Sequence, residues 1–173
     1  MIVEKTSLDG VLLIKPEIFE DFRGSYVETY NEEEYSKKGI PQHFVQDDIS
    51  TSAQGVLRGL HGDAETWKLI SCPYGRFYFV VANCDPNSPD FGKWQSFVLS
   101  DENRHQVLVP PMHGNGHLIL SEKAIFHYKQ TTYYNPKGQF TYKWDDPRLG
   151  IWWPTKAPLL SRRDEEGHYV ESI

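Results

Sequence analysis

The chain has 173 residues, 39% of them hydrophobic and 14% aromatic, which excludes a disordered protein and is enough for one domain with a substantial core. The formal net charge of -6 argues against nucleic acid as the main partner, although it does not describe the charge of a single cleft. No apolar run approaches the roughly 18 residues of a membrane span, and the charged residues among the first ten do not fit a signal peptide. We therefore expect a cytoplasmic protein that does not bind membranes, with residues 1–173 in a single domain.

Short β-rich runs separated by turn signals dominate the sequence. In chain order we expect a strand at residues 11–14, a short helix at 31–38, and strands at 76–84, 95–99, 106–109, 117–120 and 124–132. Asn31 is a suitable N-cap for the helix, and the three acidic residues after it favour the helix dipole. Several short strands at this spacing are typical of an all-β sandwich or barrel.

Residues 76–84 are apolar on both faces, as expected of a strand that is covered on both sides. Cys84 at the end of this run and Cys72 before it both have apolar neighbours. We expect both to be buried free thiols.

The run at 124–132 alternates, with Phe126, Tyr128 and Gln130 on one face and three other residues on the opposite face. A phenol among such neighbours is what the wall of a ligand cavity would present. Because a phenol keeps its proton at neutral pH, Tyr128 is a candidate general acid. The alternative is a tyrosine packed in the core, since the chain has ten of them.

His61 has two glycines close to it, Gly59 two positions before and Gly62 directly after, which leave room for a substrate. Histidine titrates near neutral pH and therefore suits a general base; a structural histidine is the alternative. Lys68 has bulky neighbours, and inside a barrel its ammonium group would stabilise an oxyanion. The local sequence by itself favours the alternative, a strand lysine that points outward.

Arg23 and Arg58 are candidates for bidentate contacts to phosphate groups, with structural salt bridges as the alternative. His113 and His117 are four residues apart, but their segment predicts a turn into a strand and not a helix. The region of His61 offers no second nearby histidine, so we expect no metal site. Glycine-rich phosphate loops, paired-cysteine zinc sites and nucleophile elbows are absent from the sequence.

Taken together, many segments resemble the dTDP-4-dehydrorhamnose 3,5-epimerase family of cupin enzymes. Each segment is weak alone, but their number and order make the likeness specific, and it extends from about Leu13 to Asp164. The segments are residues 19–24, 46–50, 55–61, 68–69, 85–89, 91–94, 99–100, 102–103, 128–129, 133–136, 144–147, 151, 153–154 and 160–161.

The resemblance implies an all-β cupin jelly roll with short flanking helices, a homodimer, and catalysis without a metal or organic cofactor. It implies that His61 is the base, Asp164 its carboxylate partner, Lys68 the cation near the developing enolate and Tyr128 the acid on the opposite face. An edge strand within residues 1–14 would be suited to pairing across subunits. The positions that match the lining of the nucleotide-sugar site are Arg23, Glu28, Gln46, Asp48 and Arg58.

Two segments depart from the family pattern. The usual His-aromatic-Gln is His61-Gly62-Asp63 here, and the usual Ala-His-Gly-Phe is Gly114-Asn115-Gly116-His117. The residues at these positions resemble those of epimerases that act on GDP-4-keto-heptoses in bacterial capsule or lipopolysaccharide synthesis. They imply a roomier and more polar sugar pocket, in which we expect Asp63, Asn115 and His117 to contact the substrate.

The predicted function is therefore inversion of C3, C5 or both in a nucleotide-diphospho-4-keto-sugar, with a GDP-4-keto-6-deoxy-heptose favoured. Three alternatives stay open: a sugar-nucleotide ketoisomerase on the same fold, a metal-dependent cupin dioxygenase, and a sugar-binding cupin without activity.

Overall fold

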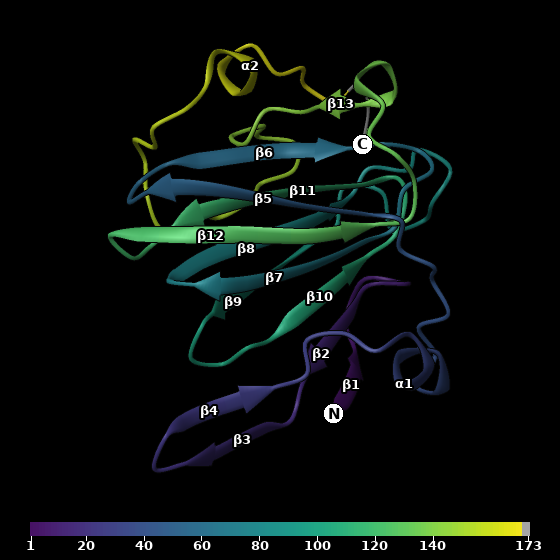
Figure 1. The fold of residues 1–173 in the computed structure, drawn as a ribbon. Coiled ribbons are helices and arrows are strands. Elements are labelled where there is room, and N and C mark those ends of the chain that lie inside the picture. Colours follow the sequence, from purple (N-terminus) through teal and green to yellow (C-terminus); the bar gives the residue numbers. More distant parts are fainter. Residues whose placement is uncertain (171–173) are drawn as a thin grey trace.

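The computed structural model describes residues 1–170, so residues 171–173 of the predicted domain lie outside it. Two antiparallel β-sheets face each other and form the body of the molecule (Figure 1). In residues 1–170 the first sheet has the order β1 (Ile2–Lys5), β2 (Leu12–Lys15), β10 (Gln106–Val109), β7 (Lys68–Tyr74), β12 (Lys123–Gln130) and β5 (Gln46–Ala53). The second has the order β13 (Phe140–Thr141), β6 (Leu57–Gly62), β11 (His113–Ile119), β8 (Arg76–Asn83) and β9 (Trp94–Ser100).

The remaining elements are short. Strands β3 (Ile18–Asp21) and β4 (Gly24–Val27) pair only with each other and form a hairpin at one extremity of the molecule, below the two sheets in Figure 1. The helices are α1 (Glu32–Lys37), α2 (Arg162–Glu165) and the 3-10 turn η1 (Pro136–Gly138). None of the helices in the described part of the chain has the length and apolar character needed to cross a membrane. The predicted all-β fold is confirmed.

Strand β8 joins the two apolar layers. One set of its side chains, including Phe79, packs between the sheets against Ile70 and Phe126 of the facing sheet. The alternate set, including Val80, packs under the C-terminal segment against Trp153. The strand is thus covered on both sides, as the apolar run at 76–84 predicted, and the C-terminal segment forms a third layer.

The predicted helix is confirmed as α1. Its N-cap, Asn31, accepts a hydrogen bond from the backbone N–H of Glu34 at 3.3 Å, and the buried Tyr35 packs on Ile14 and Leu108 at the outer face of the first sheet. Cys72 and Cys84 are buried free thiols, as predicted.

Strand β11 begins at His113, four residues before the predicted strand at 117–120, so the interpretation of the preceding residues as a turn was wrong. The glycines that suggested a turn allow close packing instead. A Cβ on Gly116 would lie 3.1 Å from the carbonyl oxygen of Arg58, and one on Gly59 would meet the Gly116 backbone. Glycine is tolerated within this strand because the backbone of β6 approaches it closely.

Candidate functional site

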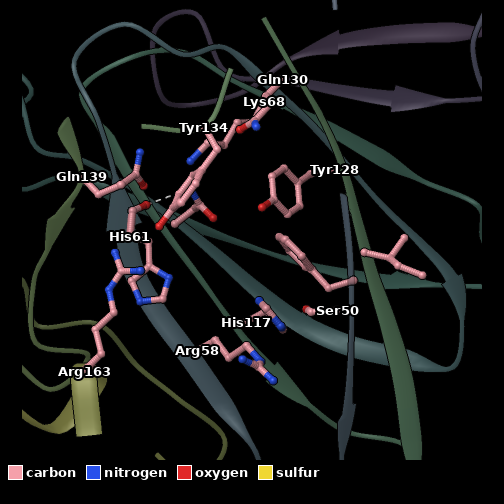
Figure 2. A pocket seen from close by; sticks show the side chains of 13 residues that line it. Ser50, Arg58, His61, Lys68, His117, Tyr128, Gln130, Tyr134, Gln139 and Arg163 are labelled. Carbon is pink, nitrogen blue, oxygen red and sulfur yellow. Dashed lines mark hydrogen bonds between the residues drawn. The ribbon is translucent and has the colours of Figure 1, made fainter. Parts of the chain in front are cut away.

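A cavity of about 260 Å³ lies between the two sheets (Figure 2). One wall comes from β5, β7 and β12 of the first sheet, and the other comes from β6 and β11 of the second. Its lining is predominantly polar: Ile49, Ser50, Arg58, His61, Lys68, Asn115, His117, Phe126, Tyr128, Gln130, Tyr134, Gln139 and Arg163.

His61 and Asp164 form a hydrogen-bonded pair at the β6 wall. The Nε2 atom of His61 lies 2.7 Å from Oδ1 of Asp164, whose side chain is 2% exposed. Asp164 also accepts hydrogen bonds from the Gly59 N–H at 3.1 Å and the Ser161 hydroxyl at 2.6 Å. Burial alone would raise the pKa of Asp164, but these hydrogen bonds hold it below its ordinary value. The ionised carboxylate therefore fixes the proton on Nε2 and leaves Nδ1 of His61 with a free lone pair.

Arg58 and His61 both line the cavity although they are three residues apart on one strand. In a regular strand this spacing would place them on opposite faces. The pairing of β6 with β11 shifts register between Asn115, which opposes His61, and His117, which opposes Arg58. This irregularity turns both side chains to the same face.

Lys68 is the first residue of β7, and its side chain is 11% exposed. Burial lowers its pKa, and the carboxylate of Asp63, whose Oδ2 lies 3.7 Å from Nζ, partly reverses this effect. Figure 2 shows the Lys68 ammonium group at one end of the space between His61 and Tyr128. Lys68 thus lines the cavity, as the family resemblance implied, and does not point outward as its local sequence favoured.

Tyr128 lies on the opposite wall from His61, and both side chains point into the space between the sheets (Figure 2). Burial and the nearby charge of Asp48, its partner residue on β5, raise the pKa of Tyr128 to about 12. The phenol therefore keeps its proton at neutral pH. The predicted face is also correct, because Phe126 and Gln130 line the same cavity.

Gln46 and Asp48 are the register partners of Gln130 and Tyr128 on β5, and they do not line the cavity themselves. The Asp48 Oδ2 accepts hydrogen bonds from the amide groups of Gln46 at 2.7 Å and Gln130 at 3.3 Å. Gln46 also accepts the backbone N–H of Tyr134 at 3.0 Å. Their contacts therefore position groups that do reach the cavity.

Asn115 and His117 are two residues apart on β11 and share its cavity face. The Asn115 amide donates to the carbonyl oxygen of His61 at 2.9 Å. His117 is 4% exposed and stacks on Phe126 with ring centroids 4.0 Å apart, and its Nε2 is buried without a hydrogen-bond partner. Burial, with the nearby Arg58 and His61, lowers the pKa of His117 to about 3, so this ring is neutral at physiological pH.

The space expected beside Gly62 does not exist, and the inference of a roomier pocket at this position was wrong. Phe140 of β13 packs directly on Gly62, and a Cβ there would collide with the Phe140 ring and lie 2.8 Å from the carbonyl oxygen of His113. Asp63 likewise does not line the main cavity, and its carboxylate is bonded to other groups of the protein.

Arg23 and Glu28 lie with the β3–β4 hairpin, away from the cavity of their own chain. Arg23 is exposed and pairs with Asp21 at 2.6 Å.

Sequence reasoning missed Arg163 and Tyr134, which do line the cavity. Arg163 directly precedes Asp164 in the chain, so the family resemblance at Asp164 could have indicated Arg163 as well.

Among residues 1–170 no group of three or more histidine, cysteine or acidic side chains is placed to hold a metal ion. His113, which the sequence paired with His117, does not line the cavity and bonds through Nδ1 to the carbonyl oxygen of Pro111 at 2.9 Å.

The geometry brings together the groups that acid–base chemistry needs: a carboxylate-oriented imidazole and a protonated phenol lie on opposite walls, with an ammonium group at one end of the space between them (Figure 2). Such a site is suited to removing a proton from one face of a carbon acid and returning one to the other face. Comparison with known proteins agrees with this class. The family model described as dTDP-4-dehydrorhamnose 3,5-epimerase matches residues 5–172.

Individual relatives match over nearly their whole length. The dTDP-4-dehydrorhamnose 3,5-epimerase of Methanothermobacter thermautotrophicus is 42% identical, over 92% of this chain and 89% of the relative. The Escherichia coli enzyme of the same name is 39% identical, over 95% of this chain and 92% of the relative. The crystal structure of the Legionella pneumophila dTDP-6-deoxy-D-glucose-3,5-epimerase with dTDP-4-keto-L-rhamnose superposes with a TM-score of 0.94 at 36% identity, covering 99% of this chain and 94% of that one.

The chain therefore belongs to the dTDP-4-dehydrorhamnose 3,5-epimerase family. It is an isomerase of the nucleotide-sugar epimerase class, and the predicted jelly roll is confirmed.

The buried His117 predicts a specific pH dependence of stability. Below about pH 6.5 the unfolded chain binds a proton at this residue that the native state does not bind, so this residue makes the native state less stable as the pH falls. A phenylalanine would keep the stack on Phe126 and remove the titration. We expect the unfolding free energy of His117→Phe to gain about 2 kcal/mol on that of the wild type between pH 7 and pH 5.

Urea denaturation at the two pH values measures this difference. The exposed His168, changed to phenylalanine, is the matched control and should follow the wild type. An identical pH dependence in wild type and His117→Phe would contradict the neutral buried state of His117.

Proposed function

We propose that the protein inverts C3, C5 or both in a nucleotide-diphospho-4-keto-sugar, with His61 as base, Tyr128 as acid and Lys68 as the group that stabilises the enolate. The observation that carries this proposal is the position of His61 and Tyr128 on opposite walls of one cavity, with Lys68 beside the space between them (Figure 2).

The chemistry follows from these positions. The Nδ1 atom of His61 takes the proton from the carbon next to the ketone, and the electron pair of the broken C–H bond moves to the ketone oxygen. The Lys68 ammonium group stabilises the resulting enolate. Tyr128 then donates its proton to the opposite face of the same carbon, which inverts the centre. Exchange with solvent returns the proton to Tyr128 and removes one from His61.

For the substrate we propose a GDP-4-keto-6-deoxy-heptose. Gly62 and Asp63 do not contribute to this proposal, because the space at Gly62 is filled and Asp63 is bonded to protein groups. It rests on Asn115 and His117, a neutral amide and a neutral imidazole on one cavity wall, which suit the additional hydroxyl group of a heptose. The relatives named above are, by contrast, named for dTDP-linked sugars.

We also propose a cytoplasmic homodimer in which the β3–β4 hairpin of one subunit reaches the cavity of the other. The hairpin carries three exposed aromatic side chains, Phe19, Phe22 and Tyr26, the second of them 98% exposed. Exposed aromatic side chains in one place mark an interaction surface. A partner's cavity is the position in which Arg23 and Glu28 would meet a nucleotide diphosphate, since neither reaches the cavity of its own chain.

Incubation with a nucleotide-4-keto-sugar in D₂O should introduce deuterium at C3, C5 or both, as measured by NMR. His61→Asn should lower exchange at both carbons by about 10²–10⁴-fold, the usual contribution of a positioned acid–base group. Tyr128→Phe should reduce inversion more than exchange, because the base still removes the proton.

Tyr133→Phe, a change at a phenol outside the main cavity, is the control and should leave both rates unchanged. Absence of exchange with every nucleotide-4-keto-sugar would refute the proposed function, and a ketose product would indicate a ketoisomerase instead.

The substrate proposal predicts that kcat/KM for the GDP-heptose exceeds that for a dTDP-linked rhamnose precursor by at least about tenfold. The double variant Asn115→His with His117→Phe, which restores the usual family residues, should shift this ratio toward the dTDP sugar. A wild type that prefers the dTDP sugar, with no shift in the variant, would show that the substrate is of the dTDP type.

The dimer proposal predicts that Arg23→Ala raises KM by roughly ten- to hundredfold, the worth of a charge-assisted hydrogen bond, with little change in kcat. The exposed Arg76, changed to alanine, is the control and should leave KM unchanged. Sedimentation equilibrium should show a dimer. A monomer that is fully active, or a KM indifferent to Arg23, would contradict the proposal.

A further inference from the structure

The carboxylate of Asp63 is fully used by the protein. Its Oδ1 accepts the backbone N–H groups of Glu65 at 3.0 Å and Thr66 at 2.7 Å, which closes the turn after β6. Its Oδ2 accepts the side-chain amide of Gln139 at 2.9 Å and lies 3.7 Å from Nζ of Lys68. The residue is 7% exposed and does not line the main cavity, so it is not placed to contact a substrate there.

Lys68 lies in an environment that otherwise disfavours a positive charge. Its register partners on the neighbouring strands, Val109 and Gln130, are uncharged. The other titratable groups that line its cavity are His61, His117, Tyr128, Tyr134, Arg58 and Arg163, and none of these is a carboxylate. Within the described part of the chain, Asp63 is the one carboxylate in ion-pair distance of Nζ.

We propose that Asp63 is a positioning residue that holds the ammonium group of Lys68 at the cavity wall and thereby sustains stabilisation of the enolate. This inference rests on the role proposed for Lys68. It assigns Asp63 a function different from the sugar contact that the sequence suggested.

The physical reason is that opposing electrostatic effects set the pKa of Lys68. Burial and the charge of Arg163 lower the pKa of Lys68, while Asp63 raises it. Removing the negative charge leaves the opposing effects, so the amine loses its proton at a lower pH. A neutral amine stabilises an enolate less than an ammonium ion does.

Asp63→Asn is the variant that tests this role. The asparagine Oδ1 still accepts the two backbone N–H groups, so the turn is preserved while the charge is lost. We expect kcat on the alkaline limb to fall roughly tenfold for each unit by which the pKa of Lys68 drops, with KM little changed. The alkaline limb of the pH–kcat profile should move to lower pH.

A double-mutant cycle separates action through Lys68 from a general structural effect. In a Lys68→Met background, Asp63→Asn should lower kcat by less than about twofold, because the ammonium group on which Asp63 acts is absent. Asp90→Asn is the matched control: it removes one carboxylate from an exposed ion pair with Lys93, N···O 2.6 Å, and should leave the profile unchanged.

An equal loss in both backgrounds, or an alkaline limb that does not move, would overturn the proposal. Titration of Lys68 by NMR of lysine side chains tests the same point without substrate. A lower pKa for Lys68 in Asp63→Asn supports the proposal even if the wild type proves inactive, and an unchanged pKa refutes it independently of the reaction.

Discussion

The hydrogen bond between His61 and Asp164 is the interaction on which the rest of the site depends. It joins β6 to helix α2, elements more than a hundred positions apart in the chain, and it gives the imidazole one tautomer and one orientation. A carboxylate that is 2% exposed is stable there because three donors share its charge. The same C-terminal segment covers the outer face of β8, so the layer that completes the core also delivers the group that orients the base.

The two-sheet architecture suits the inversion proposed for this cavity. An enolate is planar at the reacting carbon, so inversion requires a base on one face and an acid on the other. His61 and Tyr128 belong to different sheets, and facing sheets pack about 10 Å apart, a spacing that admits a sugar ring between their side chains. The alternation along β12 then directs Tyr128 inward and its neighbours His127 and Lys129 outward toward Asp47.

Local features of the chain were predictable from the sequence, and contacts between distant segments were not. Asn31 and the acidic residues after it predicted α1, and the alternation at 124–132 predicted the face of Tyr128. The pairing of His61 with Asp164 came only through resemblance, because spacing does not select one carboxylate among many. The register shift that turns Arg58 toward the cavity, and the Phe140 ring that fills the space at Gly62, depend on partner strands that no local pattern encodes.

The two departures from the family pattern have different structural outcomes. The loss of side-chain volume at Gly62 and the new carboxylate at Asp63 are compensated within the protein, by Phe140 in the first case and by Gln139 and Lys68 in the second. Asn115 and His117, by contrast, line the cavity itself. Of the two departures, only the one on β11 therefore lies at the cavity, and it lies there beside His61, Lys68 and Tyr128, which match the family pattern.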